Sequence, residues 1–294
     1  MSDRPRAEAR FFKGHGLGND YIVVEAGDAW PLTEHAIQAV CDRSRGPGSD
    51  GLVVLLSPQG PPYGLRMFNP DGSEFERSGN GLRIFGAYLA SLGRVGREPF
   101  EVSVGGDSVR LEVAEVAPGG IYDVKVEMGR AGFSAEDVGI DEGALEGSDR
   151  ILGPDGPISF VGVSVGNPHC VVFLDDPTHD DLARLGPHLT AHPAFKGGTN
   201  VQLARATGRA TVEALVWERG VGPTASSGTS ACAVAAAAVR SELVDAGPVE
   251  IRMLGGTLFV DVSEDMELTL RGPAQEIYTG ELSAGFLEVL GSPA

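Results

Sequence analysis

The chain carries the same short motifs twice, in the same order. GNDYIVVE from Gly18 returns as GNPHCVVF from Gly166, 148 residues later, and Ser78 returns as Ser227, 149 residues later. Further pairs at nearly the same spacing are Gly48 with Gly197, Phe68-Asn69 with Trp217-Glu218, PFEVSVGG with PVEIRMLGG, and VKVEMG with ELTLRG. A period this long excludes a solenoid of short repeats. The sequence therefore predicts two copies of one domain, packed as a pseudo-symmetric pair.

Within each copy, strand-like runs outnumber helix-like runs. GNDYIVVEA, GLVVLL, LRMFN and FEVSV are rich in β-branched and aromatic residues and are bounded by Gly, Pro, Asp or Asn, which predicts strands. Helices are expected from Glu34 to Arg45 after an N-cap at Thr33, over LRIFGAYLASLG, over HDDLARLGPHLTAH with a break at Pro187, and over SACAVAAAAVRSEL. A hairpin is expected at GGDS, 105–108. We predict the α+β class, with each copy forming a mostly antiparallel sheet wrapped around a central helix.

The repeats also suggest domain limits. The first repeat domain is predicted to span 1–130 and the second 131–273. The tail 274–294 has no partner in the second copy, so we expect it to return and complete the first. An acidic, glycine-rich segment, 134–157, is expected to be a surface excursion near the boundary.

Composition excludes several classes of function. The formal charge of −18 argues against nucleic-acid binding, which needs clustered Lys and Arg. The chain has no apolar run long enough for a membrane span, and its charged N-terminus does not resemble a secretion signal, so we expect a cytoplasmic protein. Cys41, Cys170 and Cys232 are expected to be buried small hydrophobic residues. The histidines form no metal-binding motif, so a metal enzyme is not expected.

The repeated Ser-Gly turn precedes an apolar helix in both copies. A helix N-terminus has unpaired N–H groups and a partial positive charge, and a small-residue turn lets a carboxylate approach them. Two such turns facing each other across a domain cleft could grip one carboxylate. They would place Ser78 and Ser227 on opposite faces of the attached carbon, as inversion of a stereocentre requires. A single Ser-Gly turn would be explained by helix capping alone. Because the turn occurs twice with matching polar residues upstream, we favour a functional role over a purely structural one.

At these motifs the chain resembles the diaminopimelate epimerase family. The resemblance covers the whole length and rests on FFKGHGLGNDYIVVE, RGPGSDGL, FNPDGSEFERSGNGLR, VSVGNPHCVVFLDD, GTNV, WERGVGPTASSGTSACA and LRGPAQEIYTG. It implies a PLP-independent epimerase, with no cofactor, that acts at the α-carbon of LL- or meso-diaminopimelate in the lysine and peptidoglycan precursor pathway. It implies a small amino-acid substrate as the binding partner, and it leaves a homodimer open.

The resemblance also implies a set of site residues. Two of the positions, Ser78 and Ser227, hold the acid–base pair in the family, and His169 and Glu218 flank them. The implied substrate-binding residues are Asn19, Asn69, Gly79, Asn80, Asn167, Asn200, Glu218, Arg219, Gly228 and Thr229. The asparagines also suit turns, and Asp20 and Asp50 are expected to be structural hydrogen-bonding residues. Glu76 and Arg77 are expected to form a solvated pair.

This chain departs from the family at the reaction centre. The family has cysteine where Ser78 and Ser227 stand, and a serine hydroxyl is a far weaker acid than a thiol that titrates near pH 8.5. Pro223 stands where the family usually has Glu. Cys232 lies inside the second helix and cannot replace the missing thiol. Two alternatives therefore remain beside the epimerase: an isomerase or lyase of the same fold acting on another small carboxylate, and a binding relative without the chemistry.

Overall fold

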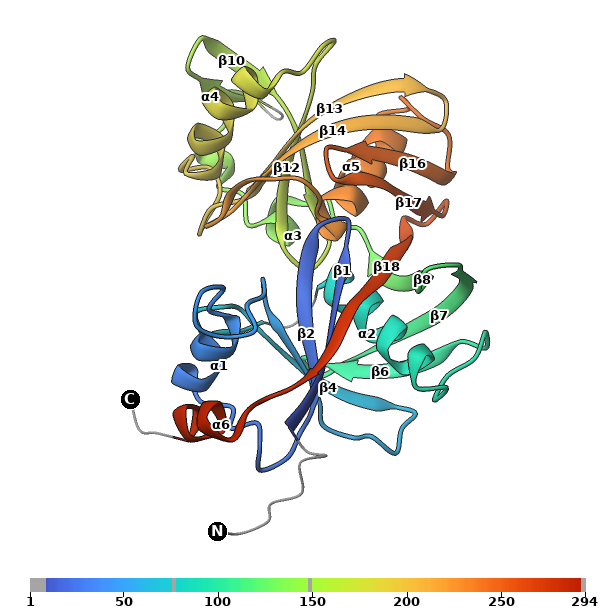
Figure 1. The fold of residues 1–294 in the computed structure, drawn as a ribbon. Helices are drawn as coiled ribbons and strands as arrows, with labels where there is room; N and C mark the ends of the chain where they lie inside the picture. The colour runs from blue at the N-terminus through green and yellow to red at the C-terminus, as the bar shows by residue number, and fades with distance from the viewer. Residues whose placement is uncertain (1–8, 76–77, 148–149, 292–294) are drawn as a thin grey trace. The chain divides into compact units, whose positions relative to one another are not determined.

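The computed structural model describes residues 9–75, 78–147 and 150–291. The chain divides into two compact units, and each is described by itself (Figure 1). Unit 1 comprises Met1–Val126 and Gly272–Ala294, and unit 2 comprises Glu127–Arg271.

Unit 1 is built from strands around two helices and ends in a short helix from the tail. Its elements are β1 (Arg10–Gly16), β2 (Asn19–Glu25), α1 (Glu34–Cys41), β3 (Leu52–Leu55), β4 (Tyr63–Phe68), β5 (Glu74–Phe75), α2 (Gly79–Ser91), β6 (Phe100–Val104), β7 (Asp107–Ala117), the first part of β8 (Ile121–Arg130), the last part of β18 (Glu267–Glu281) and α6 (Ala284–Leu290). The strands predicted in this half and the hairpin between β6 and β7 are confirmed.

Unit 2 repeats the same order of elements after a short insertion. The insertion holds α3 (Ala135–Val138), a 3-10 turn (Glu142–Ala144) and the hairpin β9 (Arg150–Gly153) and β10 (Gly156–Ser159). The repeated elements are β11 (Val161–Ser164), β12 (Pro168–Phe173), α4 (His179–Thr190), β13 (Asn200–Gly208), β14 (Thr211–Glu218), β15 (Gly222–Thr224), α5 (Gly228–Arg240), β16 (Gly247–Met253), β17 (Gly256–Val262) and the start of β18.

The pairing of strands is the same in both units. The sheet order is β1-β2-β3-β4-β6-β7 in unit 1 and β11-β12-β13-β14-β16-β17 in unit 2. In each unit the second and third strands of this order are parallel, as are the fourth and fifth, and the other pairs are antiparallel. Even the turn glycines correspond, since Gly18 and Gly166 both have φ of 93°. The predicted internal duplication and α+β class are confirmed.

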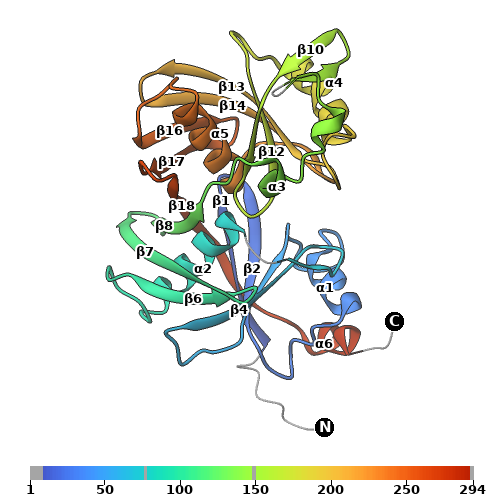
Figure 2. The ribbon, with the colours of Figure 1, turned by 180° about the vertical axis from the view of Figure 1, so that it is seen from behind.

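A returning segment completes each sheet. In unit 1, β18 pairs antiparallel with β1 from Arg10↔Glu281 to His15↔Gln275. In unit 2, Gly132 bridges Ser164, and the amide of Ala131 donates to the carbonyl of Met266. The tail continues as α6, which lies beside α1 in both views of the molecule and shares a core with it (Figures 1 and 2).

One helix lies at the centre of each unit, as predicted. Residues 79–89 of α2 are buried all round, and so are Gly228 and residues 230–238 of α5. A helix that is apolar on every side must be enclosed. The three cysteines are buried, as expected. Among the helices that the structure describes, none is long and apolar enough to cross a membrane.

Two predicted helix limits are wrong, each for a local reason. The first helix ends at Cys41 rather than Arg45, because Asp42 leaves the helical region with ψ of 116° and its carboxylate accepts the amides of Ser44 and Arg45. Pro187 does not break the second: α4 runs through it to Thr190. The buried leucines on one face of α4 lie in the unit 2 core, and their burial outweighs the cost of the proline, about 3 kcal/mol.

The acidic segment 134–157 is not wholly a surface excursion. Val138 and Ile151 are buried in the same core as α4, although most of their neighbours in sequence are exposed. Ser134 begins α3 with a capping box, and β9 and β10 form a hairpin whose Leu152 carbonyl is bonded to Nε2 of His188. The polar composition concealed two apolar residues that anchor the segment.

We expect Gly186→Ala to destabilise the protein by about 2 kcal/mol. A Cβ at this position in α4 would lie 2.6 Å from Cδ2 of Trp217, so the indole would have to shift in a packed core. The gain in helix propensity, about 1 kcal/mol, only partly offsets this. Gly285→Ala in α6 is the control, because a Cβ there contacts nothing, and we expect a gain of about 0.5 kcal/mol. Urea unfolding followed by circular dichroism measures both, and equal effects would contradict the packing argument.

Candidate active site

In unit 1 the predicted turn is the N-cap of the central helix. Ser78 is half-buried with extended φ and ψ of −135° and 117°, and its Oγ accepts the amide of Gly81 at 3.0 Å. The first full turn is closed by the amide of Leu82 on the carbonyl of Ser78. Within the described part of the chain, the amides of Gly79 and Asn80 have no acceptor. This N-terminus therefore presents two N–H groups to a ligand.

Asn80 brings a second predicted residue to the start of this helix. Its Nδ2 donates to the Oδ1 of Asn19 at 2.6 Å and to the carbonyl of Asn19 at 2.9 Å, and its Oδ1 accepts from Arg83 at 3.0 Å. Gly16 makes room for this amide, since a Cβ there would collide with Oδ1 of Asn80. Asn19 in turn donates to Asp50 at 2.9 Å. Asn19, Asn80 and Ser78 thus lie in one hydrogen-bonded region of unit 1.

An ionic network that is buried at Lys13 and Asp20 and exposed at Arg43 supports Asn19. Lys13 lies 3.0 Å from Asp20, and Arg43 bonds both Asp20 and Asp50 at 2.6 Å. Burial would raise the pKa of Asp20, but hydrogen bonds from Arg43 and Lys13 outweigh it and lower the pKa below its ordinary value. Asp20 is therefore an ionised structural partner, and Asp50 takes part in the same network through its contacts with Arg43 and Asn19. Their predicted structural role fits these contacts.

Asn69 does not join this region in the structure. It is exposed after β4, where its Nδ2 donates to the hydroxyl of Ser73 at 3.0 Å in a turn that also holds Asp71. These contacts are typical of a turn residue, which was the alternative to substrate binding in the sequence analysis. Glu76 and Arg77 lie outside the described residues.

In unit 2 the second turn repeats the first. Ser227 is a half-buried N-cap with φ and ψ of −147° and 127°, and its Oγ accepts the amide of Ser230 at 3.4 Å. Thr229 Oγ1 lies 3.5 Å from the same oxygen. Within the described residues, the amides of Gly228 and Thr229 have no acceptor, so this helix also presents two N–H groups.

His169 lies completely buried near this turn, at the start of β12. One ring nitrogen, Nε2, lies 2.8 Å from Oδ1 of Asn167, and Nδ1 lies 3.1 Å from Nε2 of Gln202. Burial lowers the pKa of His169 to about 3, because it outweighs the opposing hydrogen bond from Gln202, and the charge of Arg219 adds to the lowering. The imidazole is therefore neutral at physiological pH and bonds to Asn167, not directly to Ser227.

The remaining predicted residues form two local pairs. Asn200 is buried, donates to the carbonyl of Pro168, and accepts the backbone amide of Arg219 at 3.0 Å. The exposed Arg219 guanidinium is held by the carbonyl of Gly197 at 3.0 Å. Glu218 accepts from the hydroxyl of Thr224 at 2.8 Å.

The cysteines do not supply the thiol that the turns lack. Burial raises the pKa of both Cys170 and Cys41, which disfavours the thiolate that acid–base chemistry needs. Cys232 is fully buried in α5. The hydroxyls of Ser78 and Ser227 are therefore the candidate acid–base groups at the two turns.

Sequence reasoning missed the side chains that support the predicted ones. Gln202 and Ser230 are fully buried, and Lys13 and Arg43 hold the carboxylates. Gln202 had a detectable signal, since it is a polar residue in the apolar run NVQLA, and buried polar groups require partners. Lys13 and Arg43 had none, because no sequence pattern shows that side chains on different segments will meet at Asp20.

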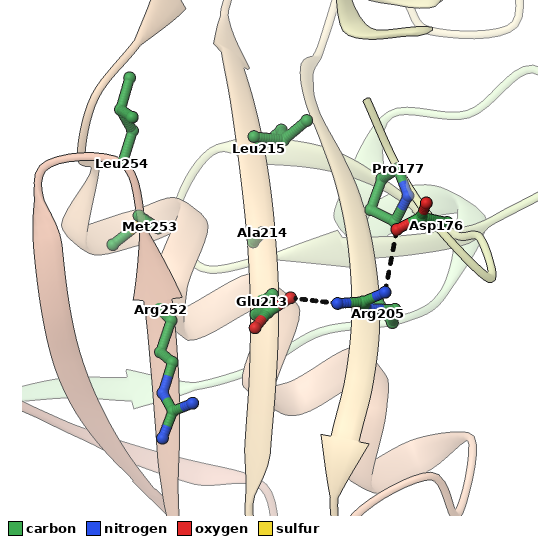
Figure 3. A pocket seen from close by; sticks show the side chains of 9 residues that line it. All are labelled: Asp176, Pro177, Arg205, Glu213, Ala214, Leu215, Arg252, Met253 and Leu254. Carbon is green, nitrogen blue, oxygen red and sulfur yellow. Dashed lines mark hydrogen bonds and ion pairs between the residues drawn. The ribbon is translucent and has the colours of Figure 1, made fainter. Parts of the chain in front are cut away.

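A pocket of about 270 Å³ lies elsewhere on unit 2 (Figure 3). It is lined by Asp176, Pro177, Arg205, Glu213, Ala214, Leu215, Arg252, Met253 and Leu254, none of which is a predicted site residue. Arg205 already pairs with Asp176 and Glu213, and Arg252 pairs with Glu250. With its cations neutralised in this way, the pocket offers no strong recognition of an anion.

Comparison with known proteins first identifies the fold. A solved structure of a predicted epimerase from Pseudomonas aeruginosa superposes with a TM-score of 0.67 at 23% identity, covering 93% of this chain and 99% of that one. A probable proline racemase from Agrobacterium radiobacter superposes with a TM-score of 0.68 at 15% identity, covering 94% and 93%. At these identities the likeness establishes the fold, which is that of epimerases and racemases.

The sequence comparisons identify the family. The model of the diaminopimelate epimerase family matches residues 11–134 and 161–277. Diaminopimelate epimerase 2 of Nostoc sp. is 37% identical over 279 residues, covering 93% of this chain and 95% of its own length. The chain belongs to the diaminopimelate epimerase family.

We expect Asp20→Asn to cost about 3 kcal/mol of unfolding free energy at neutral pH, because it leaves Lys13 without its buried carboxylate. Since the folded state lowers the pKa of Asp20, this stability is present above its ordinary value of 3.8 and is lost as the pH falls through the folded value. The difference from the unsubstituted protein should therefore narrow in acid.

Glu74→Gln is the matched control for Asp20→Asn. It breaks an exposed pair with Arg66 of similar length, 2.7 Å, and should cost less than about 1 kcal/mol. Denaturant unfolding at several pH values measures both variants. A cost for Asp20→Asn no larger than that for Glu74→Gln would show that the network is not structural.

Proposed function

We propose that this protein is a PLP-independent epimerase that inverts the α-carbon of LL- or meso-diaminopimelate in the cytoplasm. The observation that carries the proposal is the repeated N-cap. Each unit begins its buried central helix at a serine, and among the described residues two amides beside each serine hydroxyl have no acceptor. Membership of the family supports the choice of substrate.

The amides at each N-terminus suit the α-carboxylate of an amino acid. Charge-assisted hydrogen bonds from N–H groups and the positive end of the helix dipole favour an anion there. Removal of the α-proton spreads negative charge onto this carboxylate, so the same donors bind the transition state more strongly than the ground state. The proposal assigns Gly79 and Asn80 in one unit, and Gly228 and Thr229 in the other, to this role.

Other polar groups fit the rest of the substrate. Arg219 is exposed at the end of β14, and its fork of N–H donors matches a distal carboxylate. Its backbone is anchored by Asn200, so its position is defined before a substrate binds. Asn19 and Asn167 are assigned to contacts with the substrate amino groups and carboxylates.

Two-sided inversion assigns one serine to each face of the α-carbon. One hydroxyl position takes the proton while the other delivers one, and the roles exchange for the reverse direction. Each Oγ accepts a backbone amide, which stabilises negative charge on that oxygen. A hydroxyl remains a weak acid even so, and we therefore expect slow turnover, with activation of the hydroxyl through Glu218 or a positioned water.

Hydrogen exchange in D₂O tests this function directly. Incubation of LL-diaminopimelate with the protein should incorporate deuterium at the α-carbon and produce the meso form. A protein-free sample is the control. Exchange no faster than in that control, at high protein concentration, would refute the epimerase.

The serines favour one other candidate, an isomerase of the same fold that acts on a different small carboxylate. It would retain the amides that bind the carboxylate and would transfer a proton on one face only. In a thermal-shift screen of small carboxylic acids this candidate predicts stabilisation by a compound other than diaminopimelate. Stabilisation by diaminopimelate alone would exclude it.

We expect Ser78→Cys combined with Ser227→Cys to raise the rate of epimerisation at least about 100-fold, because positioned acid–base groups contribute factors of this size. Each single variant should gain much less, since inversion needs a competent group on both faces. Ser241→Cys, at the C-terminus of α5, adds a thiol away from the turn and should change nothing. No gain in the double variant would point to a different substrate.

A further inference from the structure

A continuous chain of hydrogen bonds runs through unit 2 from one predicted site residue to another. Asn167 bonds His169, His169 bonds Gln202, and Gln202 Nε2 bonds Oγ of Ser230 at 3.0 Å. The amide of Ser230 then donates to Oγ of Ser227. The three central side chains are fully buried, and only the two ends are half-buried.

The direction of each bond follows from what the buried groups can donate. Nε2 of Gln202 carries two hydrogens and meets two atoms, Nδ1 of His169 and Oγ of Ser230. Because this amide nitrogen can only donate, Nδ1 must be an acceptor and so carries no hydrogen. A neutral imidazole then has its hydrogen on Nε2, which donates to Oδ1 of Asn167 at 2.8 Å.

The reverse orientation of the Gln202 amide is less favourable. As it stands, its Oε1 is buried, and within the described residues it has no hydrogen-bond partner. Rotating the amide by half a turn would place both hydrogens of Nε2 in that position instead. An unpaired buried carbonyl is tolerated better than unpaired buried N–H groups, so the observed orientation costs less.

We propose that Gln202 and Ser230 hold His169 in its Nε2–H tautomer, and that this orients the side-chain amide of Asn167 with Nδ2 directed to the substrate. Oδ1 of Asn167 is occupied by His169, whereas Nδ2 has no acceptor within the described part of the chain. A donor at that position suits the carboxylate of an amino acid. The inference rests on the proposed function and defines the roles of His169 and Gln202 as positioning residues.

The chain cannot act as a proton relay between His169 and Ser227. A relay requires each member to accept a proton on one side while it releases one on the other. The amide nitrogen of Gln202 donates in both directions and accepts from neither neighbour. The low pKa of His169 agrees with a ring that remains neutral throughout. The buried chain therefore fixes geometry and carries no charge to the turn.

Nitrogen NMR of the full-length protein, labelled with ¹⁵N-histidine, tests the tautomer without any need for activity. The His169 signals are assigned by comparison with a His169→Asn variant. We expect Nε2 to be protonated and Nδ1 unprotonated, with no titration between about pH 5 and about pH 8. A protonated Nδ1, or a ring that titrates in this range, would overturn the proposal.

Gln202→Glu tests the consequence for the substrate. A carboxylate accepts rather than donates, so it should draw the hydrogen to Nδ1, leave Nε2 as an acceptor, and turn the Asn167 amide around. We expect KM for diaminopimelate to rise on the order of tenfold, the cost of one charge-assisted hydrogen bond, with a smaller change in kcat. Gln38→Glu, the same change on the exposed surface of α1, should leave both constants unchanged.

The outcomes separate this inference from the proposed function. If Gln202→Glu switches the tautomer and KM does not change, Asn167 is not positioned in this way and the inference fails. If Gln202→Glu does not fold, Gln202→Met removes the donor without adding a charge, and it should show a mixture of both tautomers with a raised KM. If the unsubstituted protein has the Nε2–H tautomer but catalyses no exchange, the proposed epimerase function is refuted. The contribution of Asn167 to binding is then measured as the change in the calorimetric Kd for diaminopimelate instead of KM.

Discussion

Both units depend on the complete enclosure of one helix by a sheet. The sides of α2 and α5 are covered by strands, so their polar backbone groups are available only at the ends. Enclosure also restricts side-chain size: six of the 13 residues of α5 are alanine, and in α2 a Cβ at Gly86 would lie only 3.0 Å from Val124. The N-terminus is thus the end at which an enclosed helix can meet an anion, and within the described ranges two of its amides beside the serine cap have no acceptor.

The two units support this arrangement by different electrostatics. In unit 1, Asn19 donates a hydrogen bond to Asp50, which forms an ion pair with Arg43. Arg43 and Lys13 both pair with Asp20 in the same network. In unit 2 the corresponding asparagine is held by neutral side chains, a histidine and a glutamine, in full burial. The buried site of His169 in unit 2 could not hold an isolated charge, because desolvation favours the neutral form of the side chain. The lowered pKa of His169 reflects this effect. The two units therefore place an asparagine side chain at the same position of the repeat, Asn19 in one and Asn167 in the other, but they hold it with different partners.

The sequence predicted the repeat, the fold class and the central helices because these depend on local patterns that occur twice. It failed where a long-range contact outweighed a local preference, as for Pro187, whose helix is held by buried leucines. It also failed where a local side-chain bond ended a helix early, as at Asp42. Candidate site residues were found through resemblance, yet the supporting residues Gln202 and Arg43 were not, since no pattern along the chain shows which side chains they will contact.

The serine caps meet a structural requirement that does not depend on how readily a proton moves. The cap requires an atom that accepts one amide at the start of the helix, and the hydroxyls of Ser78 and Ser227 meet that requirement. Nothing in the enclosure of α2 or α5 depends on whether that atom is oxygen or sulfur. With either atom at the cap, the amides at the N-terminus of the helix keep their positions. Under the proposed function, the two hydroxyls therefore affect the transfer of the proton and leave the hydrogen bonds to the carboxylate unchanged.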